Sequence, residues 1–222
     1  YGGGIRGGHY HSQSPEAYFA HTAGLKVIIP SNPYDAKGLL LTAMREEDPV
    51  LFMEPKRVYR SYREQVPEGD YTIEIGKAKV IQEGSDITVI TWGSNVFQCL
   101  EALDKLPEDI SVELIDLRTV TPWDAELVEE SVRKTGRCVI VHEATHKYGA
   151  TADFGYASAD TIKKLSPKHA VLNADSYAFV AMSLLRGALT TPSMLDAEPA
   201  AINAKDNEMS GLEVAWRKRR GY

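Results

Sequence analysis

Short apolar runs alternate with helix-patterned segments over the first part of the chain. Residues 25–29 and 49–53 are two apolar runs of strand length, and the segment between them carries apolar side chains at helical spacing. Asn32 and Pro33 suit the cap and the first position of a helix in that segment. Strand, helix and strand within about 30 residues is typical of a parallel crossover unit.

A second series of the same kind follows. Strands alternating with helices predict a doubly wound parallel sheet, and ligands of such sheets gather at the carboxyl ends of the strands. Here those ends lead into Trp92, Asp116 and His142. We expect strands at 79–81, 87–91, 112–115 and 138–141, and helices at 95–106 and 124–134.

The last part of the chain changes pattern. Ala174, Tyr177, Ala178 and Ala181 recur at helical spacing. The predicted fold class is therefore α/β, with parallel-sheet crossover units in two segments, followed by a mainly helical C-terminal segment.

Composition divides the chain further. Residues 61–76 are polar and contain Pro67 and Gly69, which predicts a linker. The opening YGGGIRGG has no methionine and reads as the middle of a loop, so we interpret the chain as a fragment. We expect folded segments at 1–60 and 77–143, a helical segment at 144–189 and a loosely ordered tail at 190–222.

Charge and cysteine content exclude several functional classes. The net charge of -6 argues against a nucleic-acid surface. No apolar run reaches the roughly 18 residues that a membrane-spanning helix needs, so no membrane partner is expected. Cys99 and Cys138 lie in apolar segments without paired spacing, which indicates reduced core thiols and a cytoplasmic location.

One long run of residues points to a known family. The sequence YHSQSPEAYFAH at residues 10–21 resembles the segment that follows the thiamin-facing loop in beta subunits of branched-chain 2-oxo acid dehydrogenases. The resemblance continues in separate blocks up to residue 144, among them GLKV at 24–27, IDLRT at 115–119 and HEA at 142–144.

This resemblance implies a function for the first two segments. Residues 1–60 would be the second half of a pyrimidine-binding domain and residues 77–143 a truncated transketolase-type C-terminal domain. Thiamin diphosphate with magnesium would be shared with an alpha subunit in an alpha2beta2 heterotetramer. The reaction implied is oxidative decarboxylation of a 2-oxo acid, with the acyl group passed to a lipoyl acyltransferase. The family's activating glutamate has no counterpart in this chain.

The resemblance also assigns site residues. Tyr10 and His11 would face the cofactor, and His11 would bind the substrate carboxylate or shuttle protons. Imidazole suits that role because its neutral and charged forms are both accessible near neutral pH. The competing interpretation of His11 is an ordinary polar loop residue.

A second motif begins at the end of the expected sheet. His142, Glu143 and His146 have the H-E-x-x-H spacing, which on a helix lets two imidazoles share zinc while the glutamate activates a water molecule. The run ATADFGY at 150–156 and a block at 173–179 resemble aspzincin metallopeptidases. That resemblance implies Asp153 as the third zinc ligand and Tyr156 as the hydroxyl that stabilises the oxyanion.

Three hypotheses follow for the whole chain. The first is a dehydrogenase beta-subunit fragment, and the second is a zinc-dependent endopeptidase of aspzincin type. The third is a non-catalytic fused or misassembled α/β chain. The β-branched run at 139–141 favours a strand up to His142, whereas the zinc motif requires a helix from His142 onward.

Overall fold

The computed structural model describes residues 1–3, 7 and 11–144. The expected helical segment at 144–189, apart from its first residue, and the expected tail at 190–222 lie outside the described residues. Within the described part, no helix is long and apolar enough to cross a membrane.

A parallel crossover forms the first sheet, as the apolar pattern predicts. After the short helix α2 (Glu16–Ala20), strands β1 (Lys26–Ile28) and β2 (Val50–Phe52) pair in parallel and are joined by helix α3 (Pro33–Ala43). The Asn32 side chain accepts a hydrogen bond from the Asp35 amide at 2.8 Å, which satisfies a donor at the start of α3.

The third strand of this sheet comes from much later in the sequence and was not expected. Strand β6 (Thr119–Thr121) pairs antiparallel with β1, giving the order β2-β1-β6. The 3-10 helix η1 (Lys56–Tyr59) follows β2.

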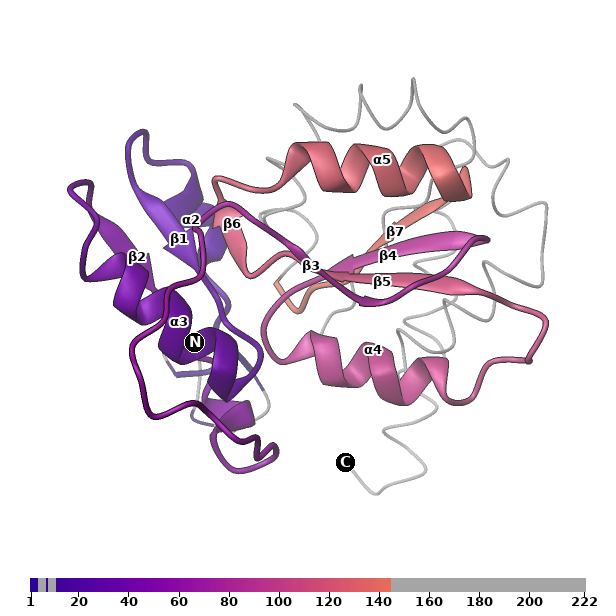
Figure 1. Ribbon diagram of the computed structural model, residues 1–222, viewed down its shortest axis with the longest axis horizontal. Helices are drawn as coiled ribbons and strands as arrows, with labels where there is room; N and C mark the ends of the chain where they lie inside the picture. The colour runs from indigo at the N-terminus through magenta and orange to yellow at the C-terminus, as the bar shows by residue number, and fades with distance from the viewer. Residues whose placement is uncertain (4–6, 8–10, 145–222) are drawn as a thin grey trace. The chain divides into compact units, whose positions relative to one another are not determined.

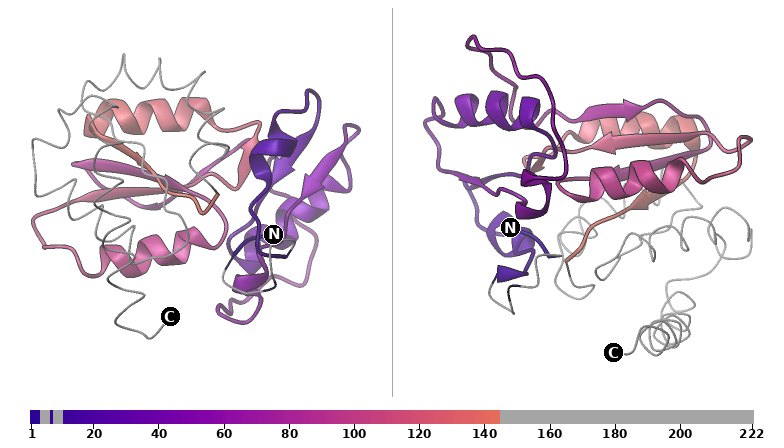
Figure 2. Two further views of the ribbon diagram at one scale, coloured as in Figure 1. Left: turned by 180° about the vertical axis from the view of Figure 1, so that it is seen from behind. Right: turned by 90° about the horizontal axis from the view of Figure 1, so that it is seen from below.

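The second sheet contains four strands in the order β3-β5-β4-β7. Strands β4 (Ile87–Thr91), β5 (Val112–Asp116) and β7 (Cys138–Ile140) are parallel, as predicted, whereas the edge strand β3 (Lys79–Gln82) is antiparallel. Helices α4 (Asn95–Leu103) and α5 (Ala125–Thr135) cover opposite faces of this sheet (Figures 1 and 2). These features confirm the α/β class for the described residues.

Helix α5 has a defined signal at each end. The Asp124 side chain accepts from the Leu127 amide at 3.3 Å, and Gly136 ends the helix with a φ of 70°. A positive φ costs glycine little because it has no Cβ.

One hydrophobic cluster joins both folded segments. It contains Val27, Ile29 and Met53 from the first segment together with Ile90, Trp92, Ile115 and other residues of the second. The predicted core cysteines, Cys99 and Cys138, are buried free thiols, and burial raises the pKa of each to about 12.

The segment predicted as a linker packs against α3. The Tyr71 ring stacks on Tyr34 at 4.7 Å between ring centroids, and Thr42 Oγ1 donates to the Ile73 carbonyl at 2.6 Å. A Cβ on Gly38 would lie 2.7 Å from Ile73 Cγ1, so glycine permits this close approach.

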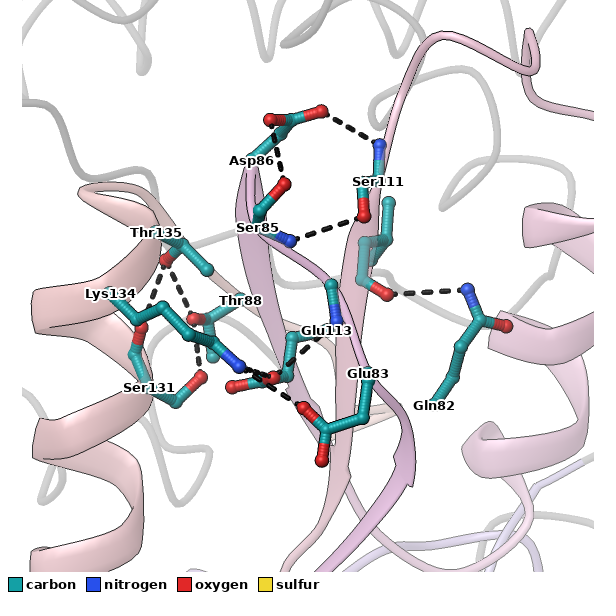
Figure 3. Close-up of polar contacts among 12 residues, drawn as sticks. Gln82, Glu83, Ser85, Asp86, Thr88, Ser111, Glu113, Ser131, Lys134 and Thr135 are labelled. Carbon is teal, nitrogen blue, oxygen red and sulfur yellow. Dashed lines mark hydrogen bonds and ion pairs between the residues drawn. The ribbon is translucent and has the colours of Figure 1, made fainter.

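The amino ends of the parallel strands carry a separate polar network (Figure 3). Buried Glu113 on β5 pairs with Lys134 of α5, which also contacts Glu83 at 3.1 Å. Thr88 on β4 shares hydrogen bonds with Ser131 at 2.7 Å and with Thr135. The partners of these buried polar groups all lie within the fold, so the network fastens α5 to the sheet.

Candidate functional site

The carboxyl ends of β4 and β7 lie side by side, and the polar residues Thr91, His142 and Glu143 lie at these ends. The Val141 amide donates to the Ile90 carbonyl at 2.8 Å, and Thr91 Oγ1 donates to the Val141 carbonyl at 2.8 Å. The two strands therefore stay paired up to the point where His142 and Glu143 leave the sheet. This edge is where ligands bind in parallel α/β folds.

His142 is a buried residue of this edge. Its relative exposure is 0%, its ring stacks on that of Trp92 with centroids 5.5 Å apart, and its Nδ1 accepts from the Ala144 amide at 3.2 Å. Residues 142–144 belong to no helix, so the helix that the zinc motif requires does not begin at His142.

Glu143 contacts the beginning of the chain. Its Oε1 accepts hydrogen bonds from the Gly3 amide at 3.2 Å and from Ser14 Oγ at 2.9 Å. The predicted water-activating carboxylate is thus engaged with the segment that includes His11.

Glu16, at the start of α2, is a fully buried carboxyl group of the same region. The Tyr1 hydroxyl lies 3.2 Å from Glu16 Oε1 and donates to it. Burial raises the pKa of Glu16 to about 7, and the negative charge of Glu143 acts in the same direction. Hydrogen bonds from the Glu16 backbone and the Tyr1 hydroxyl lower this pKa, but by less than burial raises it.

His11 is exposed, as a residue that meets a cofactor or substrate must be. The next residue, Ser12, accepts a hydrogen bond from the Gly7 amide through Oγ at 3.0 Å. Tyr10, the other predicted cofactor contact, lies outside the described residues.

The remaining predicted zinc residues, His146, Asp153 and Tyr156, also lie outside the described residues. Within residues 1–3, 7 and 11–144, no group of three or more His, Cys, Asp and Glu side chains is placed to hold a metal ion. The assignment of His142, His146 and Asp153 to zinc therefore stays a prediction.

Sequence reasoning missed a buried ionic pair between α3 and the end of β5. Arg118 contacts Asp35 through Nη2 at 2.7 Å and Nε at 3.1 Å, and Asp35 has no exposed surface. Arg118 holds a φ of 59°, which is unusual for a residue other than glycine. The partners are 83 residues apart, so no local spacing could reveal the pair.

A second buried carboxyl group lies beside this pair. Asp116 accepts from Ser31 Oγ at 2.5 Å and from the Arg118 amide at 3.0 Å. Burial raises the pKa of Asp116 to about 6, and these two donors only partly offset that effect. The two carboxyl groups are fully enclosed, so we interpret them as a structural fastening of the two segments.

Two family profiles match the chain. The profile described as transketolase, pyrimidine binding domain matches residues 1–61, and that described as transketolase, C-terminal domain matches residues 76–198. The chain belongs to the transketolase C-terminal domain family. This match extends past residue 143, where the sequence pattern places the end of that domain, and it includes the segment that resembles aspzincins.

Two relatives with similar sequences are beta subunits of dehydrogenases. The chain is 59% identical over 155 residues to the mitochondrial 2-oxoisovalerate dehydrogenase subunit beta of Dictyostelium discoideum. This alignment covers 69% of this chain and 42% of the relative. It is 49% identical over 154 residues to the pyruvate dehydrogenase E1 component subunit beta of Bacillus subtilis, covering 69% of this chain and 47% of the relative. The predicted resemblance to dehydrogenase beta subunits is confirmed, and the chain spans less than half the length of these two relatives.

A solved structure supports the fold. A split gene transketolase, described as an inactive beta4 tetramer, aligns with a TM-score of 0.65 at 22% identity, covering 81% of this chain and 62% of that chain. The cytoplasmic location stays a prediction, and the Dictyostelium relative is named as mitochondrial.

Proposed function

We propose that this chain is part of the beta subunit of a 2-oxo acid dehydrogenase. The observation that carries the proposal is the 59% identity to a 2-oxoisovalerate dehydrogenase subunit beta, compared with 49% to a pyruvate dehydrogenase subunit beta. The favoured substrate is accordingly a branched-chain 2-oxo acid. The partners are an alpha subunit, in an alpha2beta2 heterotetramer, and a lipoyl acyltransferase that receives the acyl group.

The cofactor of this proposal is thiamin diphosphate, whose thiazolium ring supplies the electron sink for decarboxylation. The match of residues 1–61 to a pyrimidine binding domain supports it. Exposed His11 fits such a group because its imidazole is accessible, and Tyr10 would lie beside it. We assign magnesium and the diphosphate to the alpha subunit.

His11 performs the proton and binding steps in this scheme. As imidazolium it pairs with the carboxylate of the 2-oxo acid, and as neutral imidazole it accepts a proton. General acid and base groups of this kind contribute about 100- to 10,000-fold to rate.

The test compares His11→Ala and His11→Asn with wild type in the assembled enzyme. We expect kcat for 2-oxoisovalerate to fall about 100-fold or more, with the affinity for thiamin diphosphate nearly unchanged. His21→Ala is the matched control, because His21 is also exposed and the family resemblance gives it no role. Full activity of His11→Ala would contradict the role of His11. A chain that binds neither an alpha subunit nor thiamin diphosphate would contradict the function itself.

The zinc endopeptidase hypothesis gains no support from the described residues, because His142 is buried and Glu143 is hydrogen-bonded to Gly3 and Ser14. Its test is the zinc content of the purified chain. One zinc ion per chain that is lost in His146→Ala would revive it.

A further inference from the structure

One oxygen atom of Glu143 joins two segments that are adjacent in space but distant from Glu143 in sequence. Gly3 is 140 residues away and Ser14 is 129 residues away, yet both donate to the same Oε1. Ser14 comes three residues after His11 in the sequence. Glu143 therefore fixes the chain close to His11.

The backbone around Gly2 confirms how closely the carboxylate is held. A Cβ on Gly2 would lie 2.6 Å from Glu143 Oε1, and the φ of Gly2 is 97°. The Gly2 amide also donates to the Gln13 carbonyl at 3.0 Å, which pairs the residues around Gly2 with those around Ser14. A side chain at position 2 would displace the carboxylate.

The support of Glu143 is rigid. Val141, two residues before it, is hydrogen-bonded to Ile90 of β4. His142, the residue next to it, is fully buried and stacks on the Trp92 ring. Groups that are hydrogen-bonded to a carboxylate on such a support are held in a fixed position relative to the sheet, because a closely packed core resists deformation.

We propose that Glu143 is a positioning residue for His11. Its carboxylate fixes Gly3 and Ser14 to the end of β7, and thereby sets where His11 is presented. The role of His11 in the reaction rests on the function proposed above, whereas the attachment of Gly3 and Ser14 to Glu143 does not.

The first experiment measures amide hydrogen exchange by NMR in the full chain. In Glu143→Ala the two hydrogen bonds are lost, and we expect the amide of Gly3, which loses its acceptor, to exchange about 10- to 100-fold faster. Glu143→Gln keeps an oxygen that can accept both bonds, so its exchange should lie between that of wild type and that of Glu143→Ala. Unchanged exchange at Gly3 in Glu143→Ala would overturn the proposal.

Two controls separate this local effect from general destabilisation. Glu126→Gln removes a carboxylate whose side chain is 88% exposed, and it should leave every loop amide unchanged. Amides of β4 and β5 report whether each variant is folded and should exchange equally in all of them. Faster exchange in these strands that matches the change at Gly3 would overturn the positioning role.

Gly2→Ala and Ser14→Ala test the same contact by changing residues that Glu143 touches. Gly2→Ala should accelerate exchange at Gly3 although Glu143 is intact, because the new methyl group occupies the place of the carboxylate. Ser14→Ala should have little further effect when it is added to Glu143→Ala, since the two changes remove the same bond. Additive effects would contradict a shared contact.

The second experiment measures turnover in the assembled enzyme. Glu143→Ala should lower kcat for 2-oxoisovalerate at least tenfold, with Glu143→Gln restoring part of it and the KM for thiamin diphosphate changing less than kcat. Faster exchange at Gly3 with unchanged kcat would overturn the positioning role even though the contact exists. If His11→Ala is also fully active, the role of His11 fails as well. The proposed function itself fails only if the chain binds neither an alpha subunit nor thiamin diphosphate, so the failures are distinguishable.

Discussion

The buried carboxyl group of Glu16 predicts that the chain loses stability as the pH rises. An ordinary glutamate has a pKa of 4.5, and burial raises that of Glu16 to about 7 in the folded chain. Between these two values the folded chain binds more protons than the unfolded chain, so the free energy of unfolding falls with rising pH. The stabilisation is complete below about pH 4.5 and is lost by about pH 7.

The magnitude follows from the size of the shift. The pKa rises from 4.5 to about 7, and about 1.4 kcal/mol for each step of one in pKa gives about 3.5 kcal/mol. Glu16→Gln removes the titration while it keeps an oxygen that accepts from the Tyr1 hydroxyl. We therefore expect the variant to match wild type near pH 4.5 and to exceed its free energy of unfolding by about 3.5 kcal/mol at pH 8.

The assay is urea denaturation of wild type and Glu16→Gln at several pH values between 4.5 and 8, with tryptophan fluorescence as the signal that reports unfolding. Asp116 also has a raised pKa, but it is present in both chains and drops out of the difference between them. Glu126→Gln corrects for the loss of one carboxylate at the surface. A difference between Glu16→Gln and wild type that stays constant over this pH range would refute the reasoning.

Two further predictions concern the contacts that fasten the segments. Arg118→Ala leaves the carboxylate of Asp35 buried without its counter-charge, and should lower the free energy of unfolding by about 3–5 kcal/mol in urea denaturation; a loss below about 1 kcal/mol would contradict the pair. Gly38→Ala places a methyl group against Ile73 and Tyr71, and should lower the free energy of unfolding by about 1–3 kcal/mol. Helix propensity alone favours alanine by about 1 kcal/mol, so a rise in Tm would show that the segment 61–76 does not pack on α3.

Local signals predicted most of the regular elements. Asn32 with Pro33 marked the start of α3, and the apolar run at 138–141 marked β7. Strand β6 was missed because Thr119–Thr121 is short and lacks an apolar run, so its pairing with β1 depends on tertiary contacts. Residues 61–76 were expected to be a linker because of their composition alone. Composition does not predict that Tyr71 and Ile73 of this segment pack against α3.

The candidate site was predicted less completely. His11 was identified through the resemblance to dehydrogenase beta subunits, and Glu143 through a zinc motif whose other members, His146 and Asp153, lie outside the described residues. The partners of Glu143 could not be found from spacing, because Gly3 and Ser14 are more than a hundred residues away. Glu16 gave no signal at all, since a glutamate at the start of a helix is ordinarily solvated.

The antiparallel pairing of β6 with β1 has a consequence for proteolysis. A protease that cut once within residues 61–76 would leave two pieces that share a strand ladder, the bond from Ser31 to Asp116 and the pair of Asp35 with Arg118. Such a nicked chain should migrate as one particle in size exclusion under native conditions and separate into two bands only in denaturant. Within the described residues, the segments before and after residues 61–76 thus behave mechanically as a single body.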